Sequence, residues 1–183
     1  MDKNSLSKLI KKLSGLEWCF MAGFAVEIYT NGKRQAGEDV DILVSPKDIN
    51  VFAKKLGCQV QKRRFKKYNF FVNDRGFETV FNNLKIEVSS GFPARRMNNG
   101  TIYKVFQKRV TKKYHGINLF VEPVEELIVH KAKMLREKDI KDLKLLSDQK
   151  INFDFLKELA KDWGKYSQTI TNLKNLGYIK AKP

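Results

Sequence analysis

Six short segments rich in β-branched and aromatic residues follow one another from Cys58 to about residue 121, separated by Asn, Asp and Gly. This pattern is typical of strands joined by tight turns. It predicts strands over residues 59–65, 68–73, 77–81, 84–89, 102–106 and 117–121. The middle of the chain is therefore expected to form an antiparallel or mixed sheet.

Helical patterns flank this region on both sides. An amphipathic helix is predicted within residues 1–15 and a second helix over 24–29, with buried strands over 17–21 and 39–44. Ser45, Pro46 and Asp48 form a helix-start signal, and that helix is expected to end near Leu56. After Pro123, helical spacing covers residues 124–135, 139–146, 153–163 and 166–176.

These patterns predict an α+β fold with two parts. The first, residues 1–121, is an α/β lobe with a mixed sheet and flanking helices. The second, residues 122–183, is a helical C-terminal lobe.

The charge of the chain is concentrated in its middle third. The 183 residues carry a formal net charge of +16, and residues 61–120 hold fourteen basic and three acidic residues. This distribution argues against a uniformly basic packaging protein and favours a polyanionic partner facing one region. The candidate polyanion-binding residues are Lys62, Arg63, Arg64, Lys66, Lys67, Arg95 and Arg96. The alternative is an ordinary solvated surface of a lysine-rich protein.

Several classes of protein are excluded by simple patterns. The two cysteines, Cys19 and Cys58, form no CxxC motif and have no nearby histidines, which argues against a disulfide framework and a structural zinc site. The N-terminus does not resemble a signal peptide, and no apolar run reaches the ~18 residues of a membrane span. We therefore expect a soluble cytoplasmic protein with no membrane partner.

The segment from Met21 to Val44 carries the clearest chemical signal. Asp39 and Asp41 stand two positions apart on a predicted strand, so their carboxylates share one face. Such a pair is a natural seat for Mg²⁺ or Mn²⁺. Ala22 and Gly23 form a small-residue turn before a helix, which can approach a phosphate closely. The alternative is that both aspartates are polar residues at a strand start.

A third acid could complete this site. In the segment LKIEV, Ile86 and Val88 are expected to face the core, which leaves Lys85 and Glu87 on the opposite face. Glu87 could bind metal or accept a proton from an attacking hydroxyl. The alternative is an exposed glutamate paired with a lysine.

Four elements in this order resemble the nucleotidyltransferase-fold superfamily, in particular its minimal, antibiotic-modifying-like and toxin-like members. They are Ala22-Gly23-Phe24-Ala25 (similar to a Gly-Gly-x-Ala turn), Asp39-Val40-Asp41, Glu87, and Lys131 followed by Arg136-x-Lys138-Asp139-x-x-Asp142. The resemblance implies catalytic and metal-binding roles for Asp39, Asp41 and Glu87. It further implies nucleotide binding by Ala22, Gly23, Phe24 and Lys131, and a lobe-joining role for Asp139 and Asp142.

The chain departs from the family pattern in two places. Many members have Gly-Ser in the turn, where this chain has Gly23-Phe24, so the phosphate contact would have to come from backbone groups or be missing. The family's Arg-x-Thr before the aspartates is absent, and Arg34 stands one place early.

Two functional hypotheses follow. The first is a Mg²⁺-dependent enzyme that moves a nucleoside monophosphate from a nucleoside triphosphate to a hydroxyl of RNA, a protein or a small molecule, with RNA, such as a tRNA end, preferred on charge. The second is a non-catalytic module on the same fold that recognises nucleic acid or a partner protein.

Overall fold

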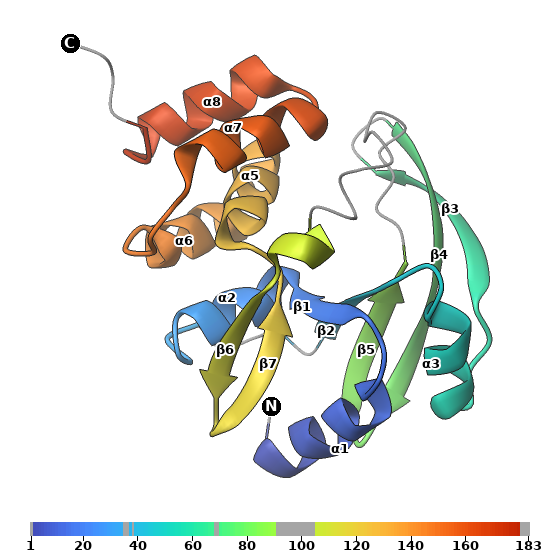
Figure 1. The fold of residues 1–183 in the computed structure, drawn as a ribbon. Coiled ribbons are helices and arrows are strands. Elements are labelled where there is room, and N and C mark those ends of the chain that lie inside the picture. Colours follow the sequence, from blue (N-terminus) through green and yellow to red (C-terminus); the bar gives the residue numbers. More distant parts are fainter. Residues whose placement is uncertain (1, 35–36, 38, 68–69, 91–104, 180–183) are drawn as a thin grey trace.

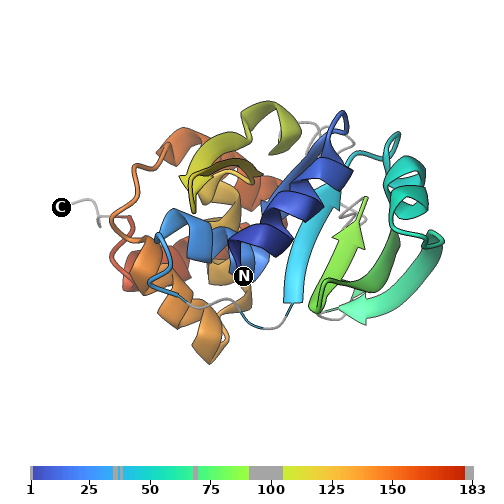
Figure 2. The same cartoon turned by 90° about the horizontal axis from the view of Figure 1, so that it is seen from below.

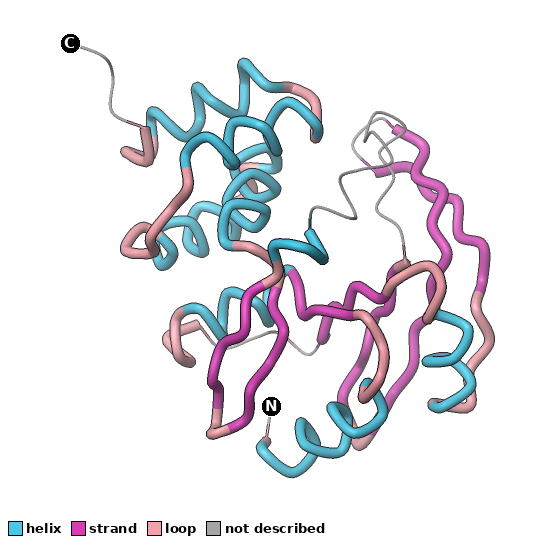
Figure 3. Tube along the Cα trace, in the orientation of Figure 1, coloured by secondary structure: helices cyan, strands magenta, loops and turns pink. Residues whose placement is uncertain are grey.

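The computed structural model describes residues 2–34, 37, 39–67, 70–90 and 105–179, with the backbone alone for strand residues between 62 and 74. Helices and strands alternate over residues 3–55, strands predominate in the described part of residues 61–121, and the elements described after residue 123 are all helices (Figures 1 and 3). The helices are α1 (Lys3–Leu13), α2 (Ala22–Tyr29), α3 (Ile49–Lys55), α5 (Val124–Met134), α6 (Glu137–Leu146), α7 (Phe153–Asp162) and α8 (Tyr166–Asn175). The strands are β1 (Trp18–Met21), β2 (Asp39–Val44), β3 (Gln61–Lys67), β4 (Phe70–Phe81), β5 (Leu84–Ser89), β6 (Val110–Tyr114) and β7 (Ile117–Val121).

The seven strands form one mixed sheet in the order β3-β4-β5-β2-β1-β7-β6. Strand β2 runs antiparallel to β1 and parallel to β5, and β1 runs parallel to β7. Both outer pairs, β3–β4 and β6–β7, are antiparallel hairpins. The predicted α+β fold with a mixed sheet is therefore confirmed.

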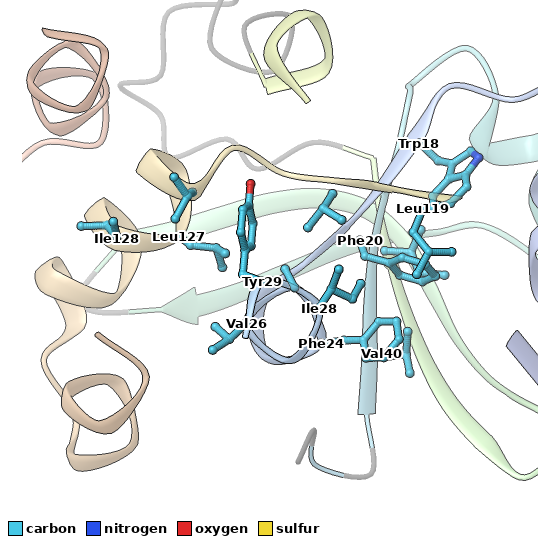
Figure 4. Close-up of a cluster of buried hydrophobic side chains, with 14 of the residues drawn as sticks. Trp18, Phe20, Phe24, Val26, Ile28, Tyr29, Val40, Leu119, Leu127 and Ile128 are labelled. Atoms are coloured by element: carbon cyan, nitrogen blue, oxygen red, sulfur yellow. The ribbon is translucent and has the colours of Figure 1, made fainter. Parts of the chain in front are cut away.

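One face of the sheet packs on helices α1, α2 and α3. Alternation along β2 directs Val40, Ile42 and Val44 to this face, and all three are buried. Helix α2 packs on β1 and β2 (Figure 2). Phe24 is among the residues that it buries there (Figure 4). The main core is thus on the side of the sheet opposite Asp39 and Asp41.

The C-terminal helices pack around α5, which contacts α6, α7 and α8 as well as α2. Their buried residues, such as Leu127 and Ile128, belong to the same connected apolar cluster as those of the sheet (Figure 4). The division at residues 121 and 122 stays a prediction. No helix in the described part of the chain is both long and apolar enough to cross a membrane.

The structure corrects the predicted strands at three places. Residues 68–73 and 77–81 were expected as two strands, but residues 70–81 form the single strand β4. The strand continues because it changes partner at Gly76, pairing with β3 before this residue and with β5 after it. Residues 105–106, expected at the end of a strand, lie in a helical segment at 105–108, and β6 was missed.

Candidate active site

Asp39, Asp41 and Glu87 lie on the sheet face opposite the main core. Asp41 is the direct partner of Glu87 in the parallel pairing of β2 with β5. Paired residues of neighbouring strands are about 4.8 Å apart and project to the same face. The neighbours Ile86 and Val88 are fully buried on the other face, as predicted. The sheet thus brings the three predicted carboxylates to one face.

Lys85 partly neutralises the negative charge of these carboxylates. It pairs with Asp39 across β2 and β5, and its Nζ lies 3.3 Å from Asp39 Oδ1. Both side chains are half exposed, at 53% for Lys85 and 50% for Asp39. A hydrogen bond to the Asp39 carboxylate, followed by its negative charge, raises the pKa of Lys85.

The carboxylates suit a metal that shares its coordination with a substrate. Among the described side chains, no three His, Cys, Asp or Glu residues are gathered closely enough to enclose a metal ion. Mg²⁺ in nucleotide sites is commonly held by one or two carboxylates, with phosphate and water oxygens completing its shell. The in-register pair Asp41 and Glu87 fits this arrangement, and metal binding by Asp39, Asp41 and Glu87 stays a prediction.

The small-residue turn lies directly beside the aspartates. Met21, the last residue of β1, pairs with Asp41, and α2 begins at the next residue. Ala22 adopts a left-handed backbone with φ of 54°, a conformation that favours glycine. Glycine, which stands at this place in the Gly-Gly-x-Ala turn that the segment resembles, adopts such a conformation without strain.

A glutamate that the sequence did not single out holds this turn. Glu122 is buried after β7, and its Oε1 accepts a hydrogen bond of 2.6 Å from the Ala22 N–H. Burial, together with the nearby charge of Glu126, raises the pKa of Glu122 well above its usual value. The only sequence signal was an acid placed directly before the proline that opens α5.

Phe24 and Gly23 serve the packing of the turn. The Phe24 side chain is fully buried and packs edge-to-face on Phe20, with ring centroids 4.8 Å apart. The Phe24 ring therefore belongs to the core, and nucleotide binding by the backbone of Phe24 stays a prediction. A Cβ at Gly23 would lie 3.0 Å from the Arg34 guanidinium, so a larger residue here would force the Arg34 side chain to shift by a few tenths of an ångström. Nucleotide binding by the turn itself stays a prediction.

Arg34 joins the turn to the helical lobe. Its Nη1 donates to the Gly23 carbonyl at 3.2 Å, and its Nε donates to Asp142 of α6. This contact was missed because the two residues are 108 positions apart. The expected lobe-joining position of Asp142 agrees with this geometry.

Lys131 belongs to the same buried cluster. Its Nζ lies 2.6 Å from Asp142 and 3.8 Å from Asp139, and its side chain is almost completely buried. Asp139 also binds Arg136, whose Nε lies 2.7 Å away. Although burial raises the pKa of Asp139, the hydrogen bonds and charge of Arg136 outweigh it and leave this pKa below its usual value. Two carboxylates thus already hold the Lys131 ammonium group. Contact between Lys131 and nucleotide phosphates stays a prediction.

The structure does not describe the side chains of the candidate polyanion-binding residues. Five of them, Lys62, Arg63, Arg64, Lys66 and Lys67, belong to β3, the edge strand next to β4, of which only the backbone is described. Arg95 and Arg96 lie outside the described residues. Polyanion binding by this block stays a prediction.

No protein-family model and no curated protein matches the chain. Solved structures do match its fold. TM1012 of Thermotoga maritima, provisionally named a nucleotidyltransferase, matches with a TM-score of 0.57 and 16% identity over 80% of this chain and 92% of its own. A nucleotidyltransferase-like protein of Paracoccidioides brasiliensis matches with a TM-score of 0.56 and 15% identity, covering 99% and 94%.

The antibiotic-resistance factor ANT(2'')-Ia, solved with adenylyl-2''-tobramycin, is a third match. Its TM-score is 0.53 and its identity 9%, over 92% of this chain and 96% of its own. At such identities the likeness concerns the fold. The comparisons therefore show that the chain has the fold of these nucleotidyltransferase structures.

Proposed function

We propose that the protein moves a nucleoside monophosphate from a nucleoside triphosphate to an acceptor hydroxyl, using Mg²⁺ or Mn²⁺ held by Asp39, Asp41 and Glu87. The observation that supports this most is the strand register that pairs Asp41 with Glu87 and also with Met21, directly before the α2 turn. A phosphate on the turn and a cation on the carboxylates would therefore be neighbours.

Different groups of the site bind the metal ion, bind the phosphates and fix the α2 turn in this proposal. A bound divalent ion supplies neutralisation of the triphosphate charge. Backbone N–H groups in the first turn of α2 offer hydrogen bonds to phosphate oxygens, assisted by the helix dipole. Glu122 fixes this turn through the Ala22 N–H, and Arg34 fixes it through the Gly23 carbonyl. The site thus acts mainly by positioning and by charge stabilisation.

The transfer itself is a substitution at phosphorus. The acceptor oxygen bonds to the α-phosphorus, the bond to the β-phosphate oxygen breaks, and pyrophosphate leaves. The proton of the hydroxyl passes to a carboxylate or to water. Glu87 is our candidate for that carboxylate because it lies beside Asp41 and is only half buried.

RNA is our preferred acceptor because residues 61–120 carry most of the net positive charge. A small-molecule acceptor is the main competitor, because the similar structure of ANT(2'')-Ia holds an adenylylated antibiotic. The proposed activity is the same for both acceptors, so one assay can compare them.

The test is transfer of labelled nucleotide. The protein is incubated with each α-³²P-labelled nucleoside triphosphate, Mg²⁺ and either total RNA, tobramycin or no added acceptor. We expect label on RNA with the wild type, loss of label with Asp41→Asn, and full labelling with the control Asp154→Asn, whose side chain is 98% exposed on α7. RNA binding without labelling by the wild type would overturn the proposal and favour the non-catalytic module.

A further inference from the structure

A cavity of about 400 Å³ lies away from the candidate active site. It is formed by the end of α2, the start of β6, the start of α5 and the segment between α6 and α7. None of the carboxylates or turn residues of the candidate site lines it. The turn is at the start of α2, whereas Tyr29 of the cavity is at its end, and eight helical residues span about 12 Å. The cavity has the size of a small-molecule site.

The charge around this cavity is positive. Lys108, Lys112 and Lys150 line it together with a single carboxylate, Glu125. The Glu125 carboxylate is buried and its Oε1 already accepts the Asn152 N–H at 2.7 Å. Across the residues that the structure describes, none of these lysines forms an ion pair with a carboxylate. The wall therefore keeps an uncompensated positive charge.

Two of these ammonium groups are held in place by aromatic rings. Lys112 Nζ lies 4.8 Å from the centroid of the Tyr29 ring, and Lys108 Nζ lies 4.7 Å from that of Phe155. Cation–π contacts restrict the lysines without cancelling their charge. The Tyr29 ring is itself fixed, because its hydroxyl donates to the Glu122 carbonyl at 2.8 Å. The cations are thus held at the wall before any ligand binds.

The rest of the lining is apolar or uncharged. Val110, Pro123, Val124 and Phe155 supply apolar surface, and Gln149 supplies a carboxamide. We propose that this cavity is a second binding site, for a small organic anion whose phosphate or carboxylate meets the lysines and whose apolar body packs on the Phe155 side. This site is independent of nucleotide transfer.

Phenyl phosphate is a suitable probe, with phenol and inorganic phosphate as comparisons. Each is titrated at low ionic strength into ¹⁵N-labelled protein while backbone amide signals are followed by NMR. We expect phenyl phosphate to shift the amides of Thr111, Val124 and Asn152, and to bind at least about tenfold more tightly than either comparison, because only it carries both charge and ring. Equal binding of all three, or shifts confined to Gly23 and Phe24, would overturn the proposal.

A matched set of lysine variants tests the charge. The double variant Lys108→Gln/Lys112→Gln is expected to weaken phenyl phosphate binding about tenfold or more. Lys113→Gln serves as control, because Lys113 is exposed on the same strand and does not line the cavity. It is expected to stay within about twofold. Thermal denaturation verifies that the double variant is folded, and unchanged affinity in a folded double variant would contradict the proposal.

Discussion

The protein contains two groups of carboxylates that differ in how their charge is balanced. Asp139 and Asp142 in the helical lobe are almost fully buried, at 1% and 3% exposed, and bind Lys131, Arg34 and Arg136. Asp39, Asp41 and Glu87 on the sheet face are half buried or exposed and lie beside one another on neighbouring strands. The same residue type thus supports the fold in one place and is available to solvent in the other.

This difference indicates what each group contributes. A buried carboxylate stabilises a protein only when cations and hydrogen bonds offset its desolvation, as they do around Asp142. Adjacent carboxylates on one strand face repel each other, so their placement costs stability. Removing a carboxylate should therefore affect stability in the helical lobe and activity on the sheet face.

The largest expected effect is on activity, at Glu87. The variant Glu87→Gln is expected to lower the transfer rate about a thousandfold, because it removes one charge that holds the metal or accepts the proton. Its melting temperature should move by at most about 4 °C, since half-exposed charges contribute about 1 kcal/mol or less. Initial rates and thermal denaturation measure the two effects.

Glu78→Gln is the matched control for this variant. Glu78 pairs with Glu87 across β4 and β5, but it is exposed and belongs to no family motif. Its transfer rate should stay within about threefold of the wild type. Equal losses in both variants would remove the special role of Glu87.

The second effect is on stability, at Asp142. The variant Asp142→Asn leaves Arg34 and Lys131 without a shared anion in a buried setting, and it should cost about 4 kcal/mol of unfolding free energy. The melting temperature should then fall by about 8–16 °C. Asp154→Asn, at an exposed carboxylate of α7, should change it by less than about 2 °C. A small loss for Asp142→Asn would show that this cluster does not hold the lobes together.

Local sequence patterns were sufficient to predict the strand face of the aspartates and the helices of the C-terminal lobe. Period-two alternation placed Asp39 and Asp41 on one face and put Ile86 and Val88 in the core, because side-chain direction in a strand depends only on position. Helix signals after Pro123 predicted α5 to α8 to within about two residues at each end. These features depend on neighbours in the sequence, so the sequence alone reveals them.

The connections between the lobes could not be predicted in this way. Arg34 meets Asp142, and Ala22 meets Glu122, only because α5 and α6 dock beside the α2 turn. No local pattern encodes such a contact between residues about 100 positions apart. Gly76 was interpreted as part of a turn for a similar reason, since its place inside β4 depends on its partners in β3 and β5.

The third effect concerns Glu126, a buried acid that, unlike Asp139 and Asp142, forms no ion pair with the lysines and arginines that the structure describes. Glu126 accepts a hydrogen bond from Trp163 Nε1, and its Oε2 has no hydrogen-bond partner among the described residues. Burial raises the pKa of Glu126 from 4.5 to about 7. Between these two pH values the folded state binds this proton more tightly than the unfolded state, so stability decreases as pH rises.

Replacing Glu126 should remove this dependence. The contribution amounts to about 3 kcal/mol between pH 4.5 and pH 7 and is constant above that range. Glu126→Gln keeps an acceptor for Trp163 and should therefore be more stable than the wild type at pH 8, with little difference at pH 4.5. Urea denaturation at several pH values measures the difference, with the exposed Glu137→Gln as control. Parallel pH curves for Glu126→Gln and the wild type would contradict the expectation.

The smallest effect concerns the backbone of the turn between the two groups. Ala22 has a φ of 54°, which costs an L-residue about 1–2 kcal/mol, while glycine loses about 0.5–1 kcal/mol through its greater freedom in the unfolded chain. Ala22→Gly should therefore stabilise the protein by about 0.5 kcal/mol, as measured by urea denaturation. Ala25→Gly in the same helix should instead destabilise it by about 1 kcal/mol or more, because Ala25 is fully buried in an ordinary helical position. Equal losses of unfolding free energy in both variants would contradict the expected backbone strain at Ala22.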